Sequence, residues 1–218
     1  MPSLCERPDI SVIVPCYNLE KWITPLLDSL KEQDLGDYKA EYIFVINCCT
    51  DKTEEVIRNS GLECQIVQCE TQGCGAARND GFEIAKGKYV WFMDGDDWLL
   101  TDTAIKEALD KAIGEDLNIL RVSWESDRFN YPYFSMVWQY VFKKEYIDEF
   151  RFKNIQPCED DVYMEQVLKK ARLNRDTYFA LPVVYTPLYF YNYLREGSNM
   201  YRHNILGERN IQLPQCKA

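Results

Sequence analysis

The sequence has only one histidine, His203, and none of its 9 cysteines forms a C-x-x-C pair. Structural zinc sites use Cys and His at such spacings, so an ordinary zinc site is excluded and reduced, buried thiols are expected. No apolar run approaches the ~18 to 20 residues that span a bilayer. The first residues also lack the basic and then apolar pattern of a signal peptide. These absences favour a cytoplasmic protein.

Positive charge is scarce as well. The chain has 25 Lys and Arg residues against 35 Asp and Glu residues, which gives a net charge of −10. The basic residues form no stripe, and this argues against a nucleic acid partner. An anionic ligand would need a bound cation or a local cluster of Arg and backbone N–H groups. The length of 218 residues suits one compact domain.

The first half of the chain alternates short apolar runs with amphipathic stretches. The predicted strands are 10–14, 42–46, 64–69 and 89–93, and the predicted helices are 22–30, 51–59, 76–86 and a helix through 105–112. Such alternation predicts an α/β fold with a mainly parallel central sheet flanked by helices. Ligands bind such sheets at the carboxyl ends of the strands.

The second half departs from this alternation. It is predicted to contain a strand at 118–124, a loop at 127–135, an apolar run at 136–142, a helix at 159–171 and an extended, Tyr-rich stretch at 181–193. Only the helix has a clear amphipathic pattern, with Met164, Val167 and Leu168 on one side. This half therefore predicts a smaller region added to the same domain.

Three carboxylates follow the predicted strand 89–93 directly, in the sequence Asp94-Gly-Asp96-Asp97. Two carboxylates at ~4 Å repel by about 4 kcal/mol at an effective dielectric near 20. A divalent cation would relieve this repulsion, and Mg²⁺ or Mn²⁺ is commonly shared between carboxylates and substrate phosphates. The alternative is a solvated acidic turn that caps the next helix. The position at the end of an apolar strand favours the metal interpretation.

Two further groups of residues allow two interpretations each. Gly73 and Gly75 precede Arg78 at the start of a predicted helix, where backbone N–H groups could face an anion. A glycine-rich loop with Arg78 on a wet helix face is the alternative, and it is favoured for this motif alone. Glu159-Asp160-Asp161 begins another predicted helix. These acids either stabilise the first helical turn or supply a general base that is ionised at neutral pH.

Taken together, these motifs resemble the family-2 glycosyltransferases, which have the GT-A fold. The resemblance extends over about 10–198. It rests on Ser11-Val-Ile-Val-Pro15-Cys-Tyr17-Asn18, Gly73 to Gly81, Gly87 to Asp97, Trp138 to Lys144, Glu159-Asp160 and Tyr191 to Ser198, in this order and spacing. It implies a donor-binding half at 1–115 and an acceptor-binding and catalytic-base region at 116–218, both within one compact domain.

The resemblance also implies a role for each matching residue on the donor side. Pro15 and Tyr17 would lie at the nucleotide base, and Arg78 would contact the nucleotide. Asp94 would hold the ribose or metal side of the donor, and Asp96 would bind the metal that bridges the diphosphate.

Near the second half of the site, Asp160 would take the proton from the acceptor hydroxyl. Arg195 and Ser198 are expected near the diphosphate, although Arg195 is equally compatible with a surface charge. His203 is a candidate metal ligand, and an exposed structural histidine is the favoured alternative.

The implied function is an inverting glycosyltransferase. It would move a sugar from a nucleotide-diphosphate donor, with a UDP-sugar favoured, to an acceptor hydroxyl with the help of Mn²⁺ or Mg²⁺. The acceptor would be a saccharide or a lipid-linked saccharide in surface polysaccharide or glycan synthesis. The family also suggests peripheral association with the cytoplasmic face of a membrane.

The sequence departs from the family after the second predicted strand. The family usually carries a D-D-G-S-T-D-like stretch there, whereas this chain reads Ile46-Asn47-Cys48-Cys49-Thr50-Asp51. Ile46 has no polar group for the base, and Asn47 becomes the candidate donor contact. A catalytically weak or inactive donor-binding relative is therefore the alternative function. A nucleotidyltransferase is disfavoured because the turn after the first strand lacks glycine.

Overall fold

The computed structural model describes residues 7–127, 136–155 and 159–192. Its strands are β1 (Ile10–Cys16), β2 (Ala40–Asn47), β3 (Gln65–Cys69), β4 (Tyr89–Phe92), β5 (Trp98–Leu99), β6 (Ile119–Ser126), β7 (Tyr140–Lys143) and β8 (Val183–Tyr191). Its helices are α1 (Thr24–Lys31), α2 (Thr53–Asn59), α3 (Cys74–Ile84), α4 (Ala104–Gly114), α5 (Lys144–Ile147) and α6 (Glu159–Lys170), with single turns η1 (Val137–Gln139) and η2 (Tyr178–Ala180).

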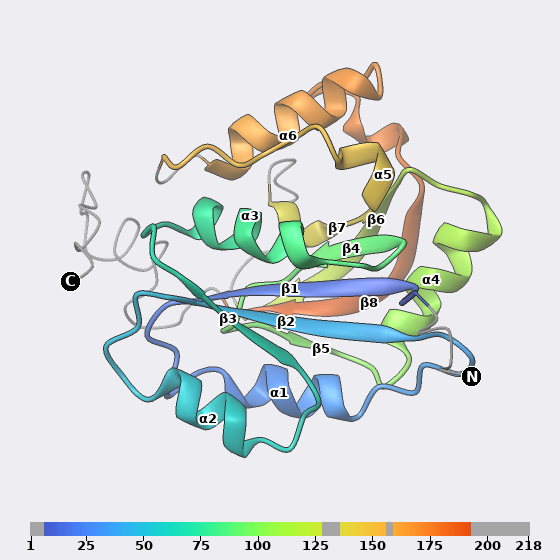
Figure 1. Ribbon diagram of the computed structural model, residues 1–218. Coiled ribbons are helices and arrows are strands. Elements are labelled where there is room, and N and C mark those ends of the chain that lie inside the picture. The colour runs from blue at the N-terminus through green and yellow to red at the C-terminus, as the bar shows by residue number, and fades with distance from the viewer. Residues whose placement is uncertain (1–6, 128–135, 156–158, 193–218) are drawn as a thin grey trace, which may run out of the picture.

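The described strands form one sheet in the order β3-β2-β1-β4-β7-β6-β8-β5 (Figure 1). The first four strands in this order are parallel, as expected for strands that helical crossovers connect. β7 pairs antiparallel with both β4 and β6, and β5 pairs antiparallel with β8. β6 and β8, both beyond residue 115, form one further parallel pair. The described sheet is therefore mixed, and the four adjacent parallel strands all come from the donor-binding half expected at 1–115.

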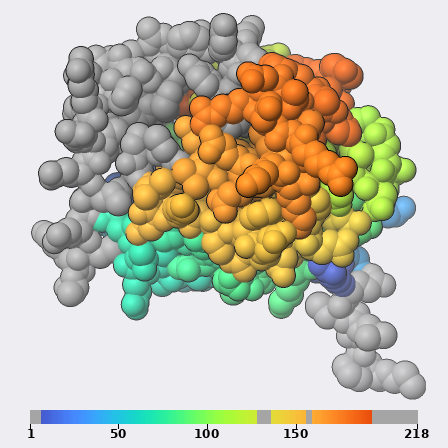
Figure 2. Space-filling view, turned by 90° about the horizontal axis from the view of Figure 1, so that it is seen from above, coloured from blue at the N-terminus to red at the C-terminus, as the bar shows by residue number. Residues whose placement is uncertain are grey.

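Helices cover both faces of the sheet because side chains alternate along each buried strand. In β1, Ile10, Val12 and Val14 belong to a core cluster shared with α1 and α4, whereas Ile13 belongs to a cluster shared with α3 and α6. Figure 1 shows α1 and α2 below the sheet and α3 and α6 above it. Seen from above, residues of 144–180 cover the middle of the α6 face (Figure 2).

Helix α3 begins at Cys74, two residues before the predicted start at Ala76. Gly73 has φ +134, and a Cβ there would lie 2.1 Å from the Asn154 side-chain oxygen. A Cβ at Gly75 would lie 2.9 Å from the Lys153 carbonyl oxygen. The two glycines thus let the helix start pack directly against the chain at 152–154. Close packing explains them, and the helix start does not need an anion.

The cysteines only partly match the expectation of reduced thiols. Cys16, Cys49, Cys64, Cys69 and Cys74 are free. Burial raises the pKa of the Cys16 and Cys74 thiols well above the ordinary value. Cys48, however, is disulfide-bonded, so the expectation is wrong at this position.

Two other expectations meet the structure with small changes. The apolar run at 136–142 divides into the single turn η1 and the strand β7. Most of the predicted loop at 127–135 lies outside the described residues. Within the described ranges, no helix combines the length and apolarity that a bilayer crossing needs.

Candidate active site

The acidic turn 94–97 lies at the carboxyl end of β4, as the sequence predicts. Met93 makes a ladder-like hydrogen bond to the Ile13 carbonyl, at 3.0 Å, before the chain turns. The turn closes with a hydrogen bond from the Asp97 N–H to the Asp94 carbonyl, at 3.2 Å. A Cβ at Gly95 would lie 2.4 Å from the Leu19 side chain, so the turn packs tightly on the β1–α1 connection.

The three carboxylates of this turn differ in environment. Asp97 is fully buried, while Asp94 and Asp96 are partly exposed. The Tyr189 hydroxyl donates to Asp97 Oδ2 at 2.6 Å, and the Asn192 N–H donates to Asp97 Oδ1 at 2.8 Å. Burial, followed by the charges of Asp96 and Asp94, raises the pKa of Asp97 well above its ordinary value. Asp97 is thus part of the framework, whereas solvent reaches part of the Asp94 and Asp96 side chains.

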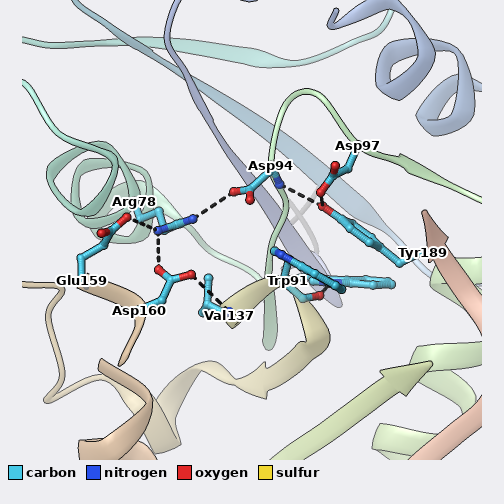
Figure 3. A network of polar contacts seen from close by, with 9 residues as sticks. Arg78, Trp91, Asp94, Asp97, Val137, Glu159, Asp160 and Tyr189 are labelled. Atoms are coloured by element: carbon cyan, nitrogen blue, oxygen red, sulfur yellow. Dashed lines mark hydrogen bonds and ion pairs between the residues drawn. The ribbon is translucent and has the colours of Figure 1, made fainter. Parts of the chain in front are cut away.

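Arg78 on α3 connects this turn with the start of α6 (Figure 3). Its Nη2 lies 2.9 Å from Asp94 Oδ1, and its Nη1 lies 2.6 Å from Asp160 Oδ1 and 3.5 Å from Glu159 Oε1. The guanidinium therefore bridges two carboxylates that the sequence predicts to serve the donor and the acceptor.

Arg78 is also deeply buried. Its side chain is 3% exposed, and its guanidinium lies 5.3 Å from the centre of the Phe152 ring. Its Nε has no hydrogen-bond partner among the residues that the structure describes. Burial alone would lower the pKa of Arg78, but Asp160, Asp94 and Glu159 raise it well above the ordinary value. The interpretation that Arg78 lies on a solvent-exposed face of its helix is therefore wrong. The nucleotide contact expected of Arg78 stays a prediction; in the structure the guanidinium is bonded to carboxylates of the protein.

Asp160 has the environment of a general base. Its side chain is 23% exposed, and Oδ2 accepts a 3.4 Å hydrogen bond from the Val137 N–H. Burial raises its pKa to about 7, with further increases from Glu159 and Asp94, while Arg78 opposes the shift. A base with a pKa near neutrality is well matched to accept a proton in a transfer reaction. The neighbouring Glu159 is buried, and burial raises its pKa as well.

The carboxyl end of β2 has a different character. Ile46 is buried and apolar. The Asn47 side chain accepts from the Gly73 N–H at 2.9 Å and donates to the Thr71 carbonyl at 2.8 Å. Both ends of the Asn47 amide thus hold the 71–73 turn, and the donor contact expected at Asn47 stays a prediction.

The nucleotide base is predicted to lie near the turn that follows β1. This turn is hydrogen-bonded to the turn that follows β2. Pro15 lies within β1 opposite Val45, and Tyr17 follows β1 with 39% of its surface exposed. Asn18 Oδ1 accepts from the Thr50 N–H at 2.8 Å, and the Glu20 N–H donates to Asp51 Oδ2 at 2.9 Å. Thr50 and Asp51, which the family pattern retains, thus hold the turn that presents Tyr17.

The carboxylates of the acidic turn fit a cation that is shared with a substrate. Within the described ranges, no three His, Cys, Asp or Glu side chains form a complete metal cage. Mg²⁺ is commonly held by one or two carboxylates together with substrate phosphates, and Asp94 and Asp96 match this donor set. The expected contributors Arg195, Ser198 and His203 lie outside the described residues.

Sequence reasoning missed the residues that hold the predicted site residues in place. These are Tyr189, Asn192, Trp138 and the backbone of Val137. Trp138 and Asn192 lie in motifs that carry the family resemblance, but those motifs gave them no role. The concentration of aromatic residues in 181–193 did not distinguish Tyr189 from the other tyrosines there.

The protein-family model described as glycosyl transferase family 2 matches residues 11–178. The poly(ribitol-phosphate) beta-N-acetylglucosaminyltransferase TarS of Staphylococcus aureus is 40% identical over 102 residues, which cover 45% of this chain and 18% of TarS. Glycosyltransferase GlyA of Streptococcus pneumoniae is 32% identical over 158 residues, which cover 69% of this chain and 22% of GlyA. The chain thus matches less than a quarter of the length of either relative.

Solved structures of similar fold include a fragment of Staphylococcus aureus TarS in complex with UDP-GlcNAc. It has a TM-score of 0.75 at 25% identity, covering 88% of this chain and 60% of that chain. A mannosyltransferase from Pyrobaculum calidifontis, in complex with GDP-Man and Mn²⁺, has a TM-score of 0.67 at 19% identity, covering 96% and 67% of the two chains. The fold is therefore GT-A, and the chain belongs to glycosyl transferase family 2.

Proposed function

We propose that the protein is a metal-dependent, inverting glycosyltransferase that moves a sugar from a nucleotide-diphosphate donor to an acceptor hydroxyl. One observation carries the proposal. Arg78 brings Asp160, a base candidate of matched pKa, and Asp94, at the end of β4, to the same edge of the sheet. The donor diphosphate would lie on the Asp94 and Asp96 side, and the acceptor would lie beside Asp160.

The proposed reaction needs only one base. Asp160 takes the proton of the acceptor hydroxyl while the acceptor oxygen attacks the anomeric carbon, and the bond to the diphosphate oxygen breaks on the opposite face. Arg78 and the Val137 N–H hold the Asp160 carboxylate in place. A divalent ion bound at Asp96, with Asp94 as a further ligand, would neutralise charge on the leaving diphosphate.

The donor we favour is a UDP-sugar, used with Mn²⁺ or Mg²⁺. Pro15 and the exposed Tyr17 would pack on the base, and Arg195 would add positive charge near the diphosphate. Support comes from the names of relatives: TarS is a poly(ribitol-phosphate) N-acetylglucosaminyltransferase, and AmsB of Erwinia amylovora is an amylovoran biosynthesis glycosyltransferase. The acceptor would accordingly be a saccharide or lipid-linked saccharide of a surface polysaccharide. Location in the cytoplasm, at the inner face of a membrane, remains a prediction.

A screen of nucleotide sugars tests the proposal. Purified protein is incubated with UDP- and GDP-sugars in Mn²⁺, and the released nucleoside diphosphate is measured with and without a chelator. We expect release from at least one UDP-sugar and its loss on chelation. Release that is unaffected by the chelator would overturn the metal dependence.

A donor-binding relative without turnover is the second candidate, and the end of β2 favours it. Ile46 offers the base no polar group, and the Asn47 amide is engaged with the 71–73 turn. Calorimetry with UDP and Mn²⁺ separates the two candidates. Tight, Mn²⁺-dependent binding without any sugar release or transfer would favour the binding protein.

A further inference from the structure

The hydroxyl of Tyr189, on β8, joins the two ends of the acidic turn (Figure 3). It donates to Asp97 Oδ2 at 2.6 Å and accepts from the Asp94 N–H at 3.0 Å. A hydroxyl can make both bonds at once because it has one proton and two lone pairs. A single atom from a strand near the end of the described chain thus spans a turn that follows β4.

The next anchor is Asn192, directly after β8. Its N–H donates to Asp97 Oδ1 at 2.8 Å, and its Nδ2 donates to the Asp96 carbonyl at 3.1 Å. With the Asp94 N–H, the Asp96 carbonyl and the Asp97 carboxylate all bonded, the backbone around Asp96 is fixed.

The Tyr189 ring is itself held firmly. It is fully buried and stacks on Trp138, with ring centres 4.8 Å apart and an angle of 10° between the planes. The Trp138 carbonyl accepts a 2.7 Å hydrogen bond from Trp91 Nε1 on β4. The residue before Trp138 is Val137, whose N–H reaches Asp160. The support of the acidic turn therefore continues into the support of the proposed base.

The strand β5, which begins directly after Asp97, also holds the acidic turn in place. Trp98 pairs with Phe190 and Leu99 pairs with Tyr189 across the antiparallel ladder. The Trp98 and Phe190 rings stack with centres 4.2 Å apart. The exit of the turn is thereby fixed to the same strand that holds its interior.

We propose that Tyr189 is a positioning residue for donor binding, whose hydroxyl sets the 94–97 turn in the conformation that receives the diphosphate and its cation. The proposal rests on the proposed function and adds a residue on β8 to its donor site. Three carboxylates in four residues repel one another, and the hydroxyl opposes opening of the turn before any cation arrives. A site held in its bound conformation binds more tightly because less ordering remains to be done on binding.

The variant Tyr189→Phe tests this, because it removes the hydroxyl and keeps the stacked ring. Tyr89→Phe is the matched control: Tyr89 is also fully buried, and its hydroxyl donates to the Ala112 carbonyl at 2.9 Å, at the start of β4 and away from the turn. UDP binding is measured by calorimetry with and without Mn²⁺, and thermal unfolding is measured for both variants. We expect Mn²⁺-dependent UDP affinity to fall about tenfold in Tyr189→Phe and to stay at the parent value in Tyr89→Phe.

Equal Mn²⁺-dependent affinity in Tyr189→Phe and the parent would overturn the proposal, as would an equal loss in both variants. Should Tyr189→Phe not fold, Asn192→Ala takes its place, because it removes the bond to the Asp96 carbonyl and keeps the backbone bond to Asp97. It should weaken Mn²⁺-dependent UDP binding severalfold, and parent-like binding would again contradict the proposal. A parent protein that shows no Mn²⁺-dependent binding would instead reject the proposed function.

Discussion

The carboxyl ends of β2 and β4 lie on either side of β1 at the same edge of the sheet, but their side chains differ in character. At β4, the acidic turn is bonded to Arg78, Tyr189 and Asn192. At β2, the corresponding position holds the buried, apolar Ile46, and the Asn47 amide is bonded to the 71–73 turn. The difference indicates a site whose polar groups are concentrated where a diphosphate and an acceptor would meet, with few for reading a base.

The sharpest way to break this comparison is at Asp160, the proposed base on the β4 side. Asp160→Asn should lower transfer by about 10²- to 10⁴-fold, because the amide cannot accept the acceptor proton. UDP affinity should change little. Transfer is measured with the donor found by the screen, and Asp161→Asn serves as the neighbouring control. Transfer at the parent rate by Asp160→Asn would remove Asp160 from the role of base.

Arg78 tests whether the β4 side depends on its buried charge cluster. Arg78→Met should lower the free energy of unfolding by about 3 to 5 kcal/mol, because three carboxylates lose their shared cation. The control is Arg58→Met, which breaks an exposed pair with Glu54 on α2 and should cost about 0.5 kcal/mol. Urea unfolding measures both variants. Equal losses would mean that the cluster adds no more stability than a surface pair.

Asp96 tests the metal on the β4 side. Asp96→Ala should weaken Mn²⁺-dependent UDP binding at least about tenfold, because it removes an oxygen ligand. Binding without Mn²⁺ should stay the same, and Asp102→Ala, an exposed site beyond the turn, should resemble the parent. Calorimetry gives both affinities. Unchanged Mn²⁺-dependent affinity would exclude Asp96 from the metal site.

The pH profile follows from the pKa of Asp160, which burial raises to about 7. The base works as the carboxylate, so kcat/KM should fall about tenfold per pH unit below that value. Stability has the opposite sign: since folding raises this pKa, the stabilising contribution of the protonated acid is lost as pH rises through about 7. A flat rate profile between pH 5 and 7 would contradict the base assignment.

The smallest expected effect concerns the β2 side. Ile46→Asp places a carboxylate where it can accept from a base N–H, and it should raise the affinity for UDP by roughly threefold to tenfold. Burial of the new charge limits the gain, since Ile46 is 4% exposed. Ile46→Leu is the control that keeps the site apolar. Calorimetry with UDP measures the affinity, and an affinity equal to that of the Ile46→Leu control would place the base elsewhere.

The sequence predicted the elements that one local pattern specifies. The strands around Val12, Phe44 and Trp91 are mostly apolar, so their existence and order along the chain follow from the sequence alone. The acidic turn after β4 was predictable for the same reason, because a turn must follow a buried strand. Helix α3 was placed two residues late, since the tight packing that Gly73 and Gly75 permit depends on residues 152–154.

Side-chain partners that are distant in sequence could not be predicted in this way. The burial of Arg78 depends on Glu159 and Asp160, which α6 brings to it on the same face of the sheet. The sequence predicted that Asn47 contacts the donor. In the structure its amide oxygen accepts a hydrogen bond from the Gly73 N–H. Tyr189 is one of 15 tyrosines, and the sequence does not show which of them lies beside the acidic turn. That placement depends on the pairing of β8 with β5.

The aromatic residues behind the acidic turn also give the protein a built-in optical signal. Four of its 5 tryptophans, Trp91, Trp98, Trp124 and Trp138, contact rings of β8 or one another. Trp98 adjoins Asp97 in the chain, so a paramagnetic ion held at Asp96 would quench its emission at short range. Intrinsic fluorescence can therefore follow the arrival of manganese and nucleotide without any attached dye.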